Sequence, residues 1–137
     1  MSFYSYLITP FLAWLCTGSL KFLINSIKAK QLAFKLIGYG GMPSNHSAIV
    51  TSMASLIAFK QSINSPAFGV AVTLAFIVIM DANGLRRTVG KHAIAINQVN
   101  LDKTEMPPLR ERVGHSKGEI LAGICVGICV GYIAHLI

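Results

Sequence analysis

Residues 118–137 read GEILAGICVGICVGYIAHLI, an apolar stretch that sets the class of the whole chain. About 20 mostly apolar residues are enough for a helix to cross the hydrocarbon core of a bilayer. Glycines recur at every fourth position inside the stretch, at Gly123, Gly127 and Gly131. Such spacing lets membrane helices approach closely, so one face of this helix is expected to pack tightly. That face either packs within the chain or forms the seam of a homodimer. We expect the homodimer, because a small bundle buries few helix faces.

Three more apolar segments come close to spanning length. They lie at 4–26, 44–60 and 66–82, and the short segment QSINS joins the last two, which predicts a helical hairpin. Of the 137 residues, 53% are hydrophobic and only 12% are charged. A soluble domain carries about 25% charged residues. The sequence therefore predicts one domain over residues 1–137, an all-α integral membrane bundle of about four transmembrane helices.

A polar stretch separates the third apolar segment from the last. Its first half, residues 84–100, has mixed apolar spacing and predicts a short interfacial helix. Its second half, residues 101–117, contains Pro107 and Pro108. This half predicts a loop with one further helical turn at 109–113.

The charges are distributed unevenly across the expected membrane. The chain has 12 Lys and Arg residues and a net charge of +7. With four spans, every basic residue except Lys60 falls on one side, together with all the acidic residues. Because basic loops of membrane proteins stay inside the cell, this side is expected to face the cytoplasm. The sequence thus predicts a multi-pass protein of the cell (inner) membrane with a cytoplasmic polar site, and no nucleic-acid partner.

Residues 40–48, GGMPSNHSA, lie just before the second apolar segment. Ser44 is a favourable N-cap, and the N–H groups at a helix N-terminus attract anions. Gly40 and Gly41 let the backbone approach a ligand closely, and His46 can transfer a proton near neutral pH. The alternative is a flexible loop followed by an ordinary helix cap.

Asp81 ends the third apolar segment and is followed by Arg86 and Arg87. An ionisable residue at the membrane boundary is costly unless it is paired, and the arginines are the obvious partners. Arginine is also the preferred bidentate ligand of phosphate, so Asp81, Arg86 and Arg87 are expected to belong to the substrate-binding site. The alternative, a positive anchor for anionic lipid headgroups, explains the arginines but gives Asp81 no role.

His115 and Glu119 lie four residues apart, so they share a face if the last segment is already helical there. A carboxylate that holds one imidazole nitrogen fixes the tautomer and leaves the other nitrogen nucleophilic. The alternative is a glutamate that only stabilises the first turn of the helix.

Together these groups could perform phosphoryl transfer, which needs a nucleophile, a proton donor and positive charge. Two histidines, a carboxylate and several cations are predicted on one side of the membrane. This set is complete without a cofactor or a metal, so none is expected. Mg²⁺ held by Asp81 and Glu119 is the alternative.

Three blocks of the sequence, in this order, resemble a known superfamily: GGMPSNHSA at 40–48, DANGLRRTVGKHAIAIN at 81–97 and LRERVGHSKGEILAG at 109–123. The first is similar to the second motif, Pro-Ser-Gly-His, of the type 2 phosphatidic acid phosphatase and vanadium haloperoxidase superfamily. The last is similar to the end of its third motif, a histidine followed four residues later by a carboxylate. With the flanking helices, the resemblance to the small, divergent bacterial and plastid branch covers nearly all of residues 5–137.

The resemblance implies a role for each matching residue. His115 would be the nucleophile that forms a phosphohistidine, and Glu119 would orient it in place of the superfamily's aspartate. His46 would protonate the leaving alcohol. Ser44 and the backbone of Gly41 would hold phosphate oxygens.

Other positions depart from the superfamily pattern. The first motif is a lysine, six residues and Arg-Pro; Lys28 and Lys35 have that spacing, but no arginine or proline is present. Asn45 replaces the glycine of the second motif, and Leu109 stands where the third motif has an arginine. The candidates for the missing cation are Arg86, Arg87, Arg110 and Arg112.

The resemblance implies hydrolysis of a phosphomonoester on a membrane lipid through a phosphohistidine. A site on the cytoplasmic face favours a phosphatidylglycerophosphate- or phosphatidate-like substrate, made in the inner leaflet. Two alternatives stay open: a non-catalytic membrane protein that binds anionic lipid headgroups, and an undecaprenyl pyrophosphate phosphatase if the topology is inverted.

Overall fold

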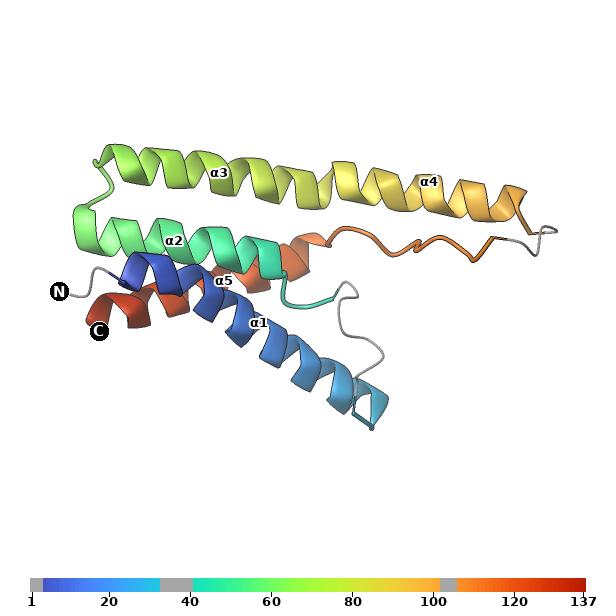
Figure 1. The fold of residues 1–137 in the computed structure, drawn as a ribbon, viewed down its shortest axis with the longest axis horizontal. Coiled ribbons are helices and arrows are strands. Elements are labelled where there is room, and N and C mark those ends of the chain that lie inside the picture. Colours follow the sequence, from blue (N-terminus) through green and yellow to red (C-terminus); the bar gives the residue numbers. More distant parts are fainter. Residues whose placement is uncertain (1–3, 33–40, 102–105) are drawn as a thin grey trace.

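The computed structural model describes residues 4–32, 41–101 and 106–137, and helices make up most of them (Figure 1). In chain order the helices are α1 (Ser5–Ala29), α2 (Asn45–Gln61), α3 (Pro66–Asn83), α4 (Leu85–Val99) and α5 (Lys117–Leu136). The prediction of an all-α membrane bundle is confirmed. Each apolar segment of the sequence forms a helix whose bounds lie close to the predicted ones.

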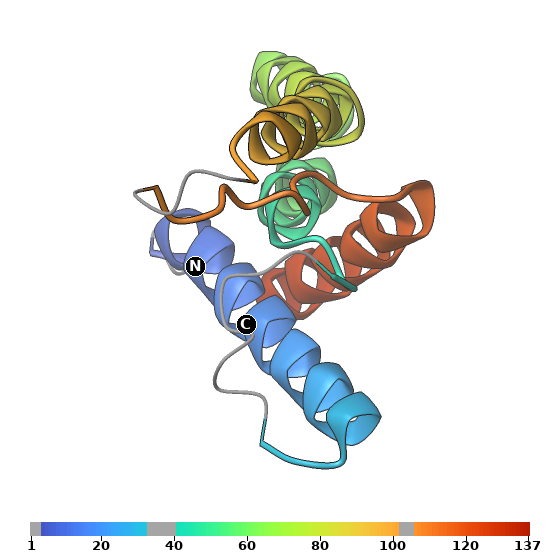
Figure 2. The same ribbon diagram turned by 90° about the vertical axis from the view of Figure 1, so that its right-hand side faces the viewer.

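The helix α2 lies at the centre of the bundle. It packs against α1, α3 and α5, and α1 also contacts α5 (Figures 1 and 2). The helices α2 and α5 begin at the same end of the bundle, whereas both chain termini lie at the opposite end (Figure 1). This arrangement brings two helix N-termini to one end.

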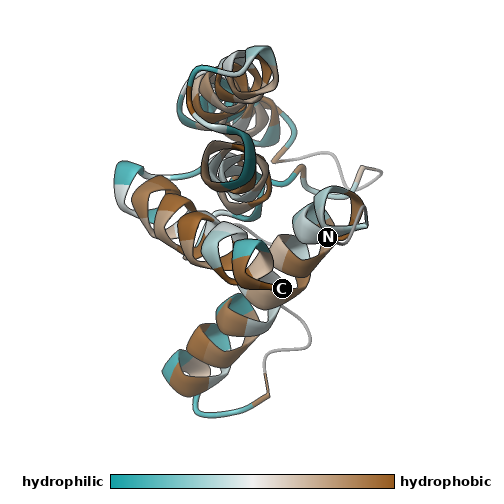
Figure 3. Ribbon diagram, turned by 90° about the vertical axis from the view of Figure 1, so that its left-hand side faces the viewer, coloured by the Kyte–Doolittle hydropathy of each residue, from teal (hydrophilic) through white to brown (hydrophobic). Residues whose placement is uncertain are grey.

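Among the described residues most fully buried side chains are small, with Leu56 the large exception, and many large apolar side chains point outward. Ala13, Ala48 and Ala82 are fully buried, whereas Phe76 is 66% exposed. Hydrophobic residues cover much of α1 and α5 in Figure 3. Lipid tails can cover such outer surfaces, and small residues between helices allow the close packing that holds membrane bundles together.

In the described part of the chain, three helical stretches are long and apolar enough to cross a membrane. They are α1, the consecutive α3 and α4 over Pro66–Val99, and α5. The helix α2 has 17 residues, a length of about 26 Å, and it carries several hydroxyl side chains. One of them, Ser55, donates its hydroxyl to the Thr51 carbonyl at 2.8 Å. The bundle therefore consists of apolar outer helices around a shorter and more polar central helix.

The helix α4 continues nearly along the direction of α3 (Figure 1). Gly84 separates the two, with φ and ψ of −102° and −88°, yet its N–H still donates to the Met80 carbonyl at 2.9 Å. The short helix predicted in this region is therefore present. Its axis extends beyond the end of the bundle instead of turning across it.

Residues 106–114 form an extended segment that runs back along α4 toward the bundle (Figure 1). The Asn97 side chain donates to the Leu109 carbonyl and accepts from the Leu109 N–H, both at 2.8 Å. A Cβ atom at Gly90 would lie 2.5 Å from the Glu111 carbonyl oxygen, so α4 and the segment touch there. The helical turn predicted at 109–113 was wrong, because the amide of Asn97 holds this backbone in an extended form.

The glycines of α5 face α2 of the same chain. A Cβ atom at Gly127 would lie 2.6 Å from the Ala48 carbonyl oxygen, and one at Gly131 would collide with the Ser55 hydroxyl. Gly123 approaches α2 in the same way. The structure corrects the prediction of a homodimer seam at these glycines, because α2 already occupies that face.

Replacing Gly127 with alanine should destabilise the bundle. The new Cβ would lie 2.6 Å from the Ala48 carbonyl oxygen and 2.8 Å from the Thr51 Cβ, so α2 and α5 must separate. Overpacking of this kind costs about 1–3 kcal/mol. At Gly69 no atom lies within 4 Å of an added Cβ, and alanine favours a helix over glycine by about 1 kcal/mol. Thermal unfolding in detergent should give a lower Tm for Gly127→Ala than for Gly69→Ala. Equal values would contradict the packing described here.

Candidate active site

The candidate site lies where α2 and α5 begin and α3 ends. Both starting helices have a serine cap: the Ser44 hydroxyl accepts the Ser47 N–H at 3.4 Å, and the Ser116 hydroxyl accepts the Glu119 N–H at 3.3 Å. The Ser44 N–H donates to the Glu119 carbonyl at 2.9 Å, which joins the two helix starts. Two adjacent helix N-termini concentrate positive potential, an environment that favours phosphate.

His115 is buried at this end of the bundle. It is 7% exposed, and its backbone N–H donates to the Ala82 carbonyl of α3 at 3.0 Å. The preceding Gly114 has a φ of +87°, and a Cβ atom there would lie 2.8 Å from the Arg87 Cγ and 2.9 Å from the Ala82 oxygen. Glycine alone fits this turn without strain, so Gly114 sets the position of the imidazole.

Glu119 holds the His115 imidazole from one side. Its Oε2 lies 3.3 Å from the His115 Nδ1 and also accepts the Ser116 N–H at 2.9 Å. The sequence predicted that His115 and Glu119 share a face, and the structure brings them together. When Nδ1–H donates to the carboxylate, Nε2 carries the free lone pair. This is the arrangement that a nucleophilic imidazole needs.

His46 lies beside His115, in the first turn of α2. The centroids of the two rings are 6.3 Å apart, and the ring planes are tilted by 53°. The Arg86 Nη1 lies 3.2 Å from the His46 Nδ1 and 3.0 Å from its Nε2. One phosphoryl group between the rings could therefore contact both imidazoles and a guanidinium.

The Asp81 carboxylate pairs with Arg86. Its Oδ2 accepts a hydrogen bond from the Arg86 Nε at 2.7 Å. The sequence placed Asp81 among the substrate-binding residues, but a carboxylate would repel a phosphate placed against it. The geometry instead fixes the guanidinium next to His46.

The surroundings make both histidines less basic. Burial lowers the pKa of His115 by more than the hydrogen bond to Glu119 raises it. Partial burial also lowers the pKa of His46, and the neighbouring Arg86 lowers it further. Both imidazoles are therefore mostly neutral at pH 7. A bound phosphate anion would raise the pKa of His46 again, because an opposite charge stabilises the imidazolium.

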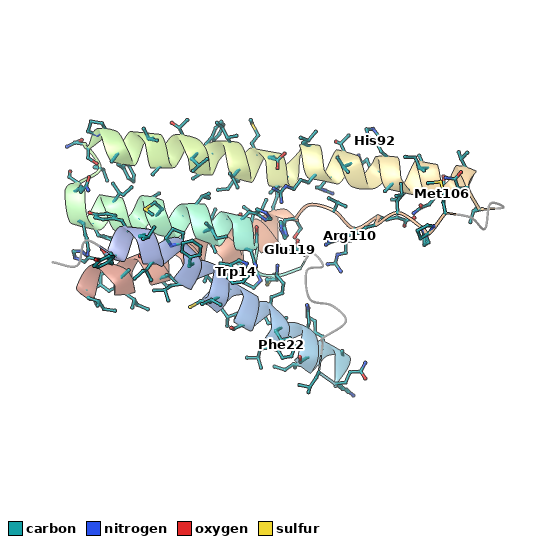
Figure 4. The ribbon with its side chains drawn as sticks, viewed as in Figure 1. Trp14, Phe22, His92, Met106, Arg110 and Glu119 are labelled. Carbon is teal, nitrogen blue, oxygen red and sulfur yellow. The ribbon has the colours of Figure 1, made fainter. Side chains whose placement is uncertain are left out.

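The two loop arginines lie near Glu119. The Arg112 Nη2 is 3.5 Å from the Glu119 Oε1, and the Arg110 Nε donates to the Arg112 carbonyl at 3.2 Å. Figure 4 shows Arg110 on the extended segment and Glu119 at the start of α5. Arg87 is exposed on α4. Ion pairs place Arg86 and Arg112, two of the candidates for the missing cation, around the histidines and Glu119: Arg86 pairs with Asp81, and Arg112 pairs with Glu119.

Lys28 and Gly41, two of the residues predicted from the motifs, lie in or against α1. Lys28 is exposed in the last turn of α1, which leans away from the other helices (Figures 1 and 2). Lys35 lies outside the described residues. Gly41 is buried with a φ of +145°, and a Cβ atom there would lie 4.0 Å from the Asn25 Oδ1, so this end of the loop sits against α1.

Lys21 of α1 was not among the predicted site residues. It is half-buried and interacts electrostatically with Glu119, and its charge also acts on His46 and His115. A signal for it was present in the sequence. A lysine inside an apolar, membrane-spanning stretch is costly, and such residues usually have a partner or a function.

The acidic residues of the site are engaged by other side chains. Asp81 binds Arg86, and Glu119 binds His115 and Ser116. Within residues 4–32, 41–101 and 106–137, no three His, Cys, Asp or Glu side chains are grouped so that they could hold a metal ion. Whether the protein uses Mg²⁺ stays a prediction.

Comparison with known proteins places these features in a family. Residues 4–130 match the family described as the Divergent PAP2 family, and this range contains all three sequence blocks around the site. A relative from Bacillus subtilis (strain 168), described as an uncharacterized membrane protein, YuiD, is 32% identical over 122 residues, with 77% of each chain covered. No solved structure matches the chain. The chain is therefore a membrane protein that belongs to the divergent PAP2 family.

Proposed function

We propose that this protein removes phosphate from a membrane lipid through a phosphohistidine at His115. One observation carries the proposal: His115 and His46 lie side by side, the first held by Glu119 and the second by Arg86. A nucleophile with its orienting carboxylate, a proton donor and a cation are thus within reach of one phosphoryl group. These are the groups that phosphoryl transfer requires.

In the first step the His115 Nε2 attacks the phosphorus atom. A P–N bond forms while the bond between phosphorus and the lipid oxygen breaks, and protonated His46 gives its proton to that oxygen. The Nδ1–H of His115 stays hydrogen-bonded to Glu119, and this carboxylate stabilises the positive charge that develops on the His115 ring. The products are the lipid alcohol and phosphohistidine.

In the second step water attacks the phosphorus atom opposite Nε2. Neutral His46 accepts a proton from this water, the P–N bond breaks, and inorganic phosphate leaves. The lone pair returns to the His115 Nε2, and His46 is protonated again, so both residues regain their starting states. Arg86, Arg112 and Lys21 supply positive charge for the phosphate oxygens throughout.

The substrate is proposed to come from the membrane itself. The site lies at one end of a bundle whose outer surface is apolar, so a lipid can present its phosphate there without leaving the bilayer. Lys60 lies at the other end, where its Nζ bonds the Ser5 hydroxyl at 3.0 Å. The excess of basic residues at the site end supports a cytoplasmic site and a phosphatidate- or phosphatidylglycerophosphate-like substrate.

Two other functions use the same features. The cations around the histidines would also suit a protein that binds anionic headgroups without chemistry. An inverted topology would expose the site to undecaprenyl pyrophosphate on the outer face. A reporter fused after Ile137 tests the orientation, since a cytoplasmic site requires the C-terminus to lie outside.

Replacing His115 with alanine should abolish phosphate release. Purified protein in detergent would be offered phosphatidate, phosphatidylglycerophosphate and undecaprenyl pyrophosphate, each with and without EDTA. Loss of the nucleophile is expected to lower kcat about a thousandfold or more. His92→Ala is the matched control, because His92 points away from the extended segment and the site (Figure 4). Release by His115→Ala equal to that of the unaltered protein, or no release from any substrate, would favour the headgroup-binding alternative.

The rate should peak on the acidic side of pH 6.5. His115 attacks when neutral, so the rate rises as pH rises through its pKa. His46 donates when protonated, so the rate falls as pH rises through its own pKa. Both values lie below the usual value of about 6.5, which places the maximum of kcat/KM below that pH.

Glu119→Gln tests the assignment of the acidic limb of this profile. The hydrogen bond from His115 to the carboxylate raises the pKa of His115, so its loss should move the acidic limb to lower pH. A maximum of kcat/KM above pH 7 in the unaltered protein would contradict the assignment of these two roles.

Asp81→Asn should slow the reaction although Asp81 does not touch the substrate. Without the carboxylate, Arg86 loses the partner that holds its Nε at 2.7 Å. A misplaced cation can cost up to about 100-fold in rate. Asp81→Glu should restore part of kcat/KM, because it keeps the charge, and both variants should show the Tm of the unaltered protein. Equal kinetics for Asp81→Asn and the unaltered protein would remove Asp81 from the mechanism.

A further inference from the structure

A groove runs along the outside of the bundle between α3 and α5. Its apolar wall consists of Phe76, Ile79 and Met80 of α3 with Ile120, Leu121 and Ile124 of α5, and its volume is about 470 Å³. Ile120 is buried at its floor, whereas Phe76, Met80 and Leu121 are exposed at its rims. This volume lies within the range of about 300–1,000 Å³ that is usual for small-molecule sites.

The polar end of the groove adjoins the candidate active site. Asn83 and Lys117 line this end. Asn83 directly follows Ala82, whose carbonyl accepts the His115 N–H, and Lys117 is two residues beyond His115. The polar end of the groove therefore lies beside the backbone segments that position His115.

The other end of the groove points toward the middle of the membrane. Asn83 and Phe76 are seven residues apart on α3, and Lys117 and Ile124 are seven apart on α5. At 1.5 Å per residue, each pair spans about 10 Å along its helix. Both helices belong to stretches that can cross a membrane, so the groove runs from the level of the headgroups into the hydrocarbon region.

We propose that this groove holds an acyl chain of the phosphorylated lipid whose phosphate lies between His46 and His115. The inference rests on the proposed function for the position of the phosphate. The Lys117 ammonium provides the complementary charge where the chain meets the phosphate. The apolar residues below it match a hydrocarbon tail, and the exposed rims let that tail enter sideways from the bilayer.

The test uses photoreactive lipids on the full-length protein in detergent–lipid micelles. One probe is a long-chain phosphatidate with a diazirine in one acyl chain, and the other is phosphatidylcholine with the same chain. After irradiation, mass spectrometry of peptides locates the label. Phosphatidate should label residues 76–80 and 120–124, unlabelled phosphatidate should compete, and phosphatidylcholine should label these residues far less.

A variant that fills the groove provides the second arm. Ile124→Trp should lose most of the phosphatidate labelling at 76–80. Ile128→Trp is the matched control, because Ile128 lies one turn further along α5 and outside the groove, and it should keep the labelling. Equal labelling by phosphatidylcholine would identify ordinary membrane lipid and overturn the proposal. Unchanged labelling in Ile124→Trp would also overturn it.

Labelling needs no turnover, so this test is separate from the test of catalysis. Selective labelling without phosphate release from any lipid would support binding of the lipid in the groove and contradict the proposed phosphatase activity. Phosphate release without labelling of the groove would overturn the groove proposal and leave the proposed phosphatase activity standing.

Discussion

The close contact between α2 and α5 is the constraint on which the site depends. Gly127 and its neighbouring glycines leave no room for a Cβ, so the two helices lie side by side. They also begin together, because the Ser44 N–H bonds the Glu119 carbonyl at 2.9 Å. His46 is carried by the first turn of α2, and the residues that hold His115 begin α5. A wider spacing between these helices would separate the two imidazoles. The close packing of α2 and α5 therefore also sets the geometry of the candidate site.

The distribution of polarity explains how so small a chain can hold a cluster of polar side chains at one end of an apolar bundle. Many large apolar side chains face outward, where lipid can cover them, and most of the fully buried side chains are alanine, serine and threonine. The acidic side chains of the candidate site lie at one end, where Asp81 pairs with Arg86, and Glu119 pairs with His115 and the Ser116 N–H. The groove between α3 and α5 begins near this end and runs along the outer surface of the bundle, which is why it is proposed to hold an acyl chain.

The sequence predicted the helices well, because long apolar runs and helix caps are local signals. The pairing of His115 with Glu119 was also predictable, since a spacing of four residues defines a helix face. Contacts between segments that lie far apart in the sequence were not predictable. The turn expected at 109–113 is extended because Asn97 bonds Leu109, and the glycine seam meets α2 and not a second chain. Lys21 reaches the site only because α1 crosses the bundle, which no local pattern shows.

Trapping the intermediate tests the central claim most directly. Purified protein would be mixed rapidly with phosphatidate carrying a radioactive phosphate, quenched in alkali within a single turnover, and digested for mass analysis. The mechanism predicts an acid-labile, alkali-stable phosphoryl group on His115 that forms before free phosphate appears. Release of phosphate without this adduct, or with the label on another residue, would contradict the assignment of His115 as the nucleophile.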